Sequence, residues 1–268
     1  MKLCTFLPNQ YLYPYISRYW VWENESCLPK IFSGTGTELM FTYGEPLNVI
    51  HKGQILTLPK SYLMMPRFDC YQLQAHGHYG FISVRFRAGA FRHFCPNSST
   101  EFIDTFVAID ELWGTKGLVL QETLLSTNDA TGKIKIIERY LMRVLLENQK
   151  MDRYVDAAVN LLLYNYQSVN INKLSQLFFV SQRQMERKLK TAVGISPKGF
   201  QKISRFEALI KKLLLSRETK YLNMAMDYGY YDQSHFLKDC KKYLGEVPYS
   251  FLQEKNFSSH FYNETLHI

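Results

Sequence analysis

The pattern of hydrophobic and polar positions changes once along the chain, near Asp104. Before this point, short runs rich in β-branched and aromatic residues are separated by glycine, proline, asparagine or aspartate, which is typical of strands and turns. These runs are residues 16–22, 38–43, 47–51, 54–58 and 79–86. Several short strands at this spacing predict a β-sandwich or a small β-barrel over residues 1 to about 110.

After Asp104 the apolar residues recur every three or four positions, which is the spacing of amphipathic helices. Two helices are predicted at residues 118–125 and 134–146, with a polar loop between them. The periodicity lapses at residues 148–152, which we interpret as the boundary between a domain at 1–150 and a domain at 151–255. Further helices are predicted at residues 153–166, 172–178, 182–193, 197–216, 222–228 and 233–244, followed by a tail at 256–268.

The second domain contains one unit written twice, at residues 181–200 and 232–251, and the two copies align without a gap. Each copy opens with a residue that caps a helix N-terminus, Ser181 or Asp232, and Gln184 completes a capping box in the first copy. Each copy ends with glycine, proline and an aromatic residue at the same spacing: Gly194, Pro197 and Phe200, then Gly245, Pro248 and Phe251. A short capped helix that follows another apolar helix, repeated in this way, predicts two helix-turn-helix units joined by a long helix.

The net charge points to the partner of this second domain. The chain has 268 residues, 46% of them hydrophobic, which is enough for two domains with a core each. Its formal net charge is +8. Residues 169–255 contain 16 Lys and Arg against 8 Asp and Glu, whereas the rest of the chain contains 16 of each. The excess of positive charge therefore lies on the repeated helices, which favours nucleic acid as the partner over a merely solubilising basic surface.

Cysteine usage and hydropathy indicate the compartment. Five cysteines are spread along the chain without a Cys-x-x-Cys pair: Cys4, Cys27, Cys70, Cys95 and Cys240. This argues against a disulfide framework or a structural zinc site. No run has the length of a signal peptide core or a membrane span. We therefore expect a cytoplasmic protein that does not associate with membranes.

A helix that enters the major groove reads bases through side chains near its N-terminal end and holds phosphates through Lys and Arg around it. Met185 and Leu189 in the first copy, and Phe236, Cys240 and Tyr243 in the second, should face the core. The outward residues then expected to contact bases are Gln182, Arg183, Glu186, Arg187, Gln233, Ser234, Leu237 and Lys238. Phosphate contacts are expected from Lys190, Lys198, Lys202 and Lys241. For any single position, the alternative is a solvated helix face.

The second copy and its lead-in read Gly-Tyr-Tyr-Asp-Gln-Ser-His-Phe at residues 229–236, followed by Gly245, Pro248 and Phe251. This pattern resembles the signature of the AraC/XylS family of bacterial transcriptional regulators, and the resemblance extends over about residues 153–253. It implies two recognition helices in successive major grooves, about one helical turn (~34 Å) apart. Lys238 stands where the family usually has arginine, which favours a point-charge contact. Leu237 and Cys240 also depart from the family pattern.

The first domain resembles the cupin-like β-barrel that members of this family use to sense an effector, followed by helices that dimerise. Residues 86–91 resemble a piece of such sensor domains. His51, His76 and His78 have no carboxylate close by except Asp69, so a hairpin turn is favoured over a metal site and we expect no cofactor. Candidate effector contacts are Trp20, Arg85 and Arg87, for which core packing or solvent exposure is the alternative.

These patterns predict a two-domain α+β protein with a β-barrel-like N-terminal sensor and an all-helical DNA-binding domain. We expect a transcription activator, not an enzyme, because neither a nucleophile with its base nor a phosphate-binding glycine loop is discernible. The expected partners are double-stranded DNA, a second copy of the chain, RNA polymerase and a small-molecule effector. Two alternatives stay open: a ligand-binding module whose helical half contacts protein, and a metal-dependent cupin-like enzyme fused to a DNA reader.

Overall fold

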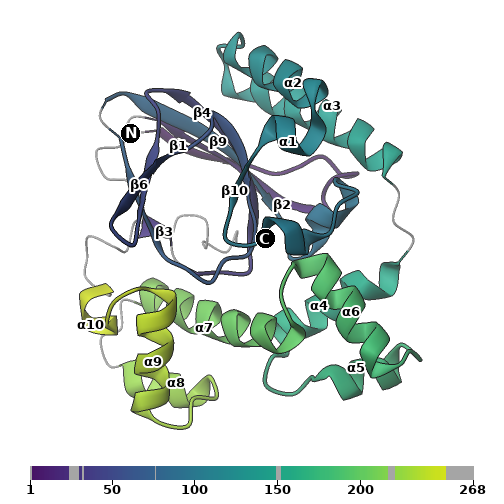
Figure 1. Cartoon of the computed structure of the whole chain (residues 1–268), viewed down its shortest axis with the longest axis vertical. Coiled ribbons are helices and arrows are strands. Elements are labelled where there is room, and N and C mark those ends of the chain that lie inside the picture. Colours follow the sequence, from purple (N-terminus) through teal and green to yellow (C-terminus); the bar gives the residue numbers. More distant parts are fainter. Residues whose placement is uncertain are drawn as a thin grey trace.

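The strands lie before Ile109 and the α-helices from Ile109 onward, in a computed structural model that describes residues 2–23, 30–31, 33–75, 77–148, 152–216 and 221–251 (Figure 1). The architecture is therefore α+β with a β-rich N-terminal domain and a helical C-terminal domain. The predicted boundary at 148–152 falls partly outside the described residues, and the predicted tail at 256–268 falls wholly outside them.

The N-terminal domain contains two antiparallel sheets. The larger has the order β1 (Lys2–Phe6), β2 (Ile16–Glu23), β9 (Tyr79–Phe86), β4 (Thr37–Gly44), β7 (Ser61–Met64) and β10 (Phe106–Ala108). The smaller has the order β3 (Lys30–Ile31), β8 (Tyr71–Gln74), β5 (Asn48–His51) and β6 (Gln54–Thr57). Each strand expected from the sequence is present within about one or two residues, whereas β1, β3, β7, β8 and β10 are additional.

The two sheets do not close into one barrel. Within the described residues, the outer strands β1 and β10 of the larger sheet pair only with β2 and β7, and no ladder joins the two sheets. One face of the larger sheet packs on the smaller sheet, and aromatic side chains fill the space between them. Those with almost no exposed surface are Trp20, Trp22, Tyr62, Tyr71, Tyr79 and Phe81. The space between the strands that appears open in Figure 1 is therefore filled by buried side chains.

The opposite face of the larger sheet is covered by α1 (Ile109–Trp113), α2 (Thr115–Leu125) and α3 (Ala130–Glu147) (Figure 1). The buried residues of α3 are Ile134, Ile137, Leu141 and Val144, which follow the three-to-four spacing read from the sequence. They join the alternate residues of the sheet, such as Val21, Leu39 and Ile82, in one core. The side chains that alternate along each strand therefore belong to two different cores.

The C-terminal domain contains α4 (Arg153–Tyr164), α5 (Ile171–Leu177), α6 (Gln182–Val193), α7 (Pro197–Ser216), α8 (Tyr221–Asp227), α9 (Gln233–Tyr243) and α10 (Pro248–Phe251). Figure 1 shows α7 running between the group α4–α6 and the group α8–α10. Its buried residues include Phe200, Phe206 and Leu213, which pack in one core with residues of both groups. None of the described helices is long and apolar enough to cross a membrane.

Candidate nucleic-acid interface

The first helix-turn-helix unit is formed by α5, a tight turn and α6. The Asn170 side chain accepts from the backbone N–H of Lys173 (3.0 Å), and the Ser181 hydroxyl oxygen accepts from that of Gln184 (3.2 Å). These bonds satisfy free amides in the first turns of α5 and α6. Helix α6 ends at Gly194, whose φ of 83° is the left-handed conformation that glycine adopts without strain. The predicted capping box consists of two hydrogen bonds, and the one accepted by the Ser181 side chain is present.

The second unit repeats this construction with α8 and α9. The Asp232 carboxylate accepts from the backbone N–H of His235 (2.7 Å) at the start of α9. Gly245, with a φ of 75°, follows the end of α9, and Pro248 begins α10. Gly229 takes a φ of 84° in the turn between the two helices. The two copies in the sequence are therefore two copies in the fold, with the same caps and the same stop signals.

The turn of the second unit is held by a residue of α7. The Arg205 guanidinium lies over the Tyr230 ring, 3.9 Å from its centroid, and donates to the Gly229 carbonyl oxygen (3.1 Å). It also pairs with Asp239 (3.2 Å), which accepts from the Tyr230 hydroxyl (3.0 Å). Burial, together with the Asp239 charge, raises the pKa of Tyr230, so the phenol stays protonated and can donate. Lys198 and Lys202 of the same helix are exposed, whereas the Arg205 guanidinium packs against the second unit.

The residues predicted to face the core do so. Met185 and Leu189 are buried in α6, and Phe236, Cys240 and Tyr243 are buried in α9. Burial raises the pKa of the Cys240 thiol, which therefore behaves as an apolar core group. The residues predicted to point outward are exposed, except that Leu237 is half-buried: Gln182, Arg183, Glu186, Arg187, Lys190, Lys198, Lys202, Gln233, Ser234, Lys238 and Lys241.

Several predicted contact residues of the first unit meet in one groove. A groove of about 1100 Å³ lies between α6 and the start of α7, and its lining includes Arg183, Glu186, Arg187, Lys190 and Lys198. Asn170 and Gln201 also line it. The Gln182 amide lies outside this lining and donates to the Asn172 side chain (3.0 Å). The arrangement offers guanidinium, ammonium and carboxylate groups to a ligand that covers the exposed side of α6.

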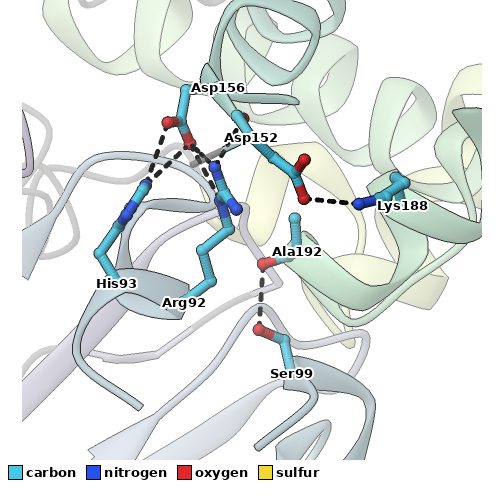
Figure 2. Close-up of polar contacts among 7 residues, drawn as sticks. All are labelled: Arg92, His93, Ser99, Asp152, Asp156, Lys188 and Ala192. Carbon is cyan, nitrogen blue, oxygen red and sulfur yellow. Dashed lines mark hydrogen bonds and ion pairs between the residues drawn. The ribbon is translucent and has the colours of Figure 1, made fainter. Parts of the chain in front are cut away.

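The N-terminal domain holds the opposite side of α6 and the start of α4 (Figure 2). Arg92 and His93 both contact the Asp156 carboxylate at 3.0 Å, and Arg92 also donates to the Asp152 carbonyl oxygen (2.9 Å). The Asp152 carboxylate in turn accepts from Lys188 of α6 (2.6 Å). Ala192 is joined to Ser99 by a buried hydrogen bond. The N-terminal domain therefore leaves open the side of α6 that carries the predicted base contacts Arg183, Glu186 and Arg187.

The candidate effector residues separate into two places. Trp20 lies in the core between the sheets, whereas Arg85 and Arg87 line a pocket of about 620 Å³ between the two domains. Arg18, which also lines this pocket, stacks on the Trp20 ring at 4.6 Å. Sequence reasoning missed Arg18 and Lys211 as lining residues, although Arg18 shares a strand with Trp20. His51 pairs with Asp69 (2.8 Å), and His76 lies outside the described residues.

Comparison with known proteins identifies the helical domain. Residues 174–254 match the model of a helix-turn-helix domain, and residues 4–108 match a domain of unknown function, DUF6597. The C-terminal domain is an AraC-type helix-turn-helix domain. The chain is accordingly a DNA-binding transcription regulator. No curated protein sequence matches it.

Solved structures of ToxT from Vibrio cholerae share the fold of this AraC-type regulator. One ToxT structure has 12% sequence identity and a TM-score of 0.50, and the match covers 87% of this chain and 97% of that chain. Another, bound to (E)-4-(8-methylnaphthalen-1-yl)but-3-enoic acid, has 11% identity and a TM-score of 0.50, with 94% of this chain and 98% of that chain covered. At these identities the likeness concerns the fold alone.

Proposed function

We propose that this AraC-type regulator binds two successive major grooves through α6 and α9. The observation that carries the proposal is the repeated construction of the two helices: each is capped in the same way and each exposes polar side chains along its first turns. Helix α7, which packs with both units, joins them. Two helices presented by one domain suit two contacts on one DNA molecule.

The first helix carries the richer set of base-reading groups. Arg187 and Arg183 can donate two parallel hydrogen bonds to guanine, and Glu186 can accept from cytosine. All three are exposed and line the groove in front of α6. In α9 the corresponding set is Gln233, Ser234, Leu237 and Lys238, where the half-buried Leu237 and the single charge of Lys238 offer fewer hydrogen bonds. We therefore expect α6 to read more base positions than α9.

Phosphate contacts fall to the exposed lysines around these helices, namely Lys190, Lys198, Lys202 and Lys241. Each neutralised phosphate releases counterions, so the logarithm of the affinity should fall with the logarithm of the salt concentration by about 0.9 per phosphate. This salt dependence distinguishes DNA binding from the alternative in which the helical half contacts protein.

Selection of bound duplexes from a random DNA pool, with the full chain at moderate salt, tests the proposal. We expect a motif in two parts with centres about 10 base pairs apart. Enrichment of one part alone would contradict base reading by α9. No enrichment, together with no salt-sensitive retention on DNA, would overturn the proposal in favour of the protein-interaction alternative. Stoichiometric metal in the purified protein would instead favour the metal-dependent enzyme, against our inference that the chain is not an enzyme.

We also propose that the regulator acts as a dimer, with the outer faces of α2 and α3 as the contact. Exposed apolar side chains gather on these helices: Leu118, Val119, Leu125 and Leu146. A second copy of the chain packed against these helices would bury the four side chains. Removing such an apolar patch from water favours association. Contact with RNA polymerase, activation and a cytoplasmic location are further parts of the proposal, and they are supported by the family of the DNA-binding domain.

An effector completes the proposed function. Buried aromatic side chains fill the space between the two sheets. The pocket between the domains is therefore the better candidate site for a small molecule. Arg85 and Arg87 line this pocket, and the related fold of ToxT accommodates a carboxylic acid. A ligand at this position would touch both the sensor domain and α7, which suits control of DNA binding.

A further inference from the structure

The Glu207 carboxylate of α7 sits in a cradle formed by the N-terminal domain. One oxygen, Oε2, accepts from the backbone N–H of Thr35 (2.9 Å) and from the Thr35 hydroxyl (2.6 Å). The other, Oε1, lies 3.4 Å from Nη2 of Arg85. A backbone amide, a hydroxyl and a guanidinium that converge on one carboxylate make a carboxylate-binding site. Its present occupant is a residue of the chain itself.

The cradle is held in place without help from Glu207. Nη1 of Arg85 pairs with Glu38 (2.5 Å), and the other oxygen of Glu38 accepts from the Ser83 hydroxyl (3.0 Å). Gly36 packs against the guanidinium, since a Cβ atom at this position would lie 1.9 Å from its central carbon. Because Glu38 and Ser83 fix Arg85 from within the N-terminal domain, the donors stay oriented when a different anion arrives.

The cradle opens into the interdomain pocket, where positive charge is in excess. Among the described residues that line the pocket, Arg18, Arg85, Arg87 and Lys211 are cationic, and Glu207 is the acidic residue. With Glu38 included, four positive charges face two negative ones. Burial lowers the pKa of Lys211, and repulsion from Arg18 and Arg85 adds to this effect. The pocket is therefore complementary to a ligand with about two negative charges.

We propose that a small organic dianion binds in this pocket and takes the place of the Glu207 carboxylate in the cradle. One anionic group would accept from Thr35 and Arg85, and the other would approach Lys211. Phe86, Leu163 and Tyr164 line the pocket beside them and would contact the carbon body. A compact dicarboxylate or phosphate monoester satisfies this charge, whereas the single charge of a long-chain fatty acid leaves part of it unbalanced.

This inference rests on the proposed function and adds a route of regulation. The Glu207 contact is a direct bond between the sensor domain and α7, and α7 carries both helix-turn-helix units. A dianion that displaces Glu207 would release this bond while it adds contacts to Lys211 of the same helix. The position of α7 against the sheet would then depend on the ligand, and so would DNA affinity.

Isothermal titration of the full chain with succinate, glycerol 3-phosphate and oleate tests the proposal. We expect binding of at least one of the two dianions in preference to oleate, and which of them binds separates the dicarboxylate from the phosphate ester. Lys211→Gln should weaken this binding about tenfold, because a hydrogen bond to a charged group is lost. Glu207→Gln should strengthen it, because the internal competitor is neutralised. Lys212→Gln, the exposed neighbour on the same helix, is the matched control and should bind as the original chain does.

The opposite signs of the two variants separate ligand contact from general destabilisation. Thermal melts of both variants, measured in parallel, should show cooperative unfolding like that of the original chain, so that each effect on ligand binding comes from a folded protein. Absence of dianion binding in the original chain and in Glu207→Gln, or weaker binding in Glu207→Gln, overturns the inference and leaves the DNA-binding proposal intact. Preferred binding of oleate with no effect of Lys211→Gln overturns it as well.

Discussion

The Ser99 hydroxyl donates to the carbonyl oxygen of Ala192, 3.0 Å away, near the C-terminal end of α6. The bond joins residues 93 positions apart and is buried. Close to it, a Cβ atom on Gly194 would lie 2.4 Å from the Ile103 side chain, so the N-terminal domain packs directly on the end of the helix. The N-terminal domain thus contacts the end of α6 directly.

Ser99→Ala should lower the free energy of unfolding by about 1–3 kcal/mol, because the Ala192 carbonyl oxygen loses its partner in a buried position. Denaturant unfolding of the two chains measures this difference. Ser126→Ala removes a hydroxyl of the same kind at an exposed site and should change the stability by less than about 0.5 kcal/mol. Equal effects of the two substitutions would contradict a special role for the Ser99 bond.

Phe179→Gly should stabilise the first unit. Phe179 has a φ of 54° in the turn before α6 and its side chain is 95% exposed, so it gains little from packing. The corresponding position of the second unit is Gly229, with a φ of 84°. Relief of the left-handed strain should raise the free energy of unfolding by about 1–2 kcal/mol. The greater conformational entropy of glycine in the unfolded chain offsets part of this gain. We therefore expect a net increase of up to about 1 kcal/mol. Leu177→Gly, two residues before it at the end of helix α5, should destabilise by about 1 kcal/mol in the same thermal melts.

Arg187→Ala should relax base preference at one position of the binding site, at a cost of roughly 1–3 kcal/mol. Selection from a random pool with the variant measures this preference. The partner experiment is Lys190→Ala, which should weaken binding to all sequences alike and reduce the salt dependence by about one phosphate. An unchanged preference in Arg187→Ala, or a selective change in Lys190→Ala, would show that the two roles are assigned incorrectly.

Val119→Glu should shift the regulator from dimer to monomer. Val119 is 56% exposed on α2 beside Leu118, and a charge there would be buried in the proposed contact at a cost of several kcal/mol. Sedimentation equilibrium over a range of concentrations detects the shift. Glu111→Lys, an exposed charge change on α1, is a control that should leave the association unchanged. A monomeric original chain would refute the dimer itself.

Local patterns in the sequence were sufficient for the DNA-binding domain. The N-caps Ser181 and Asp232, the stop at Gly194 and the alternation of buried and exposed residues along α6 and α9 depend on neighbours a few positions away. The same holds for strands such as β2 and β9, whose composition marks them. Such signals survive in the sequence because the hydrogen bonds of a helix turn, and the period of a strand, are set within a few residues.

Only the tertiary structure decided which distant residues meet. It set two sheets packed on aromatic side chains instead of one closed barrel, and it packed Arg205 against Tyr230. It also brought Thr35 to Glu207, 172 positions away, and thereby formed the cradle. No periodicity encodes these contacts, because they depend on how two independently patterned domains dock and on which edges of a sheet find partners. The two helix-turn-helix units could therefore be predicted from the sequence alone, whereas the site that we propose for their control could not.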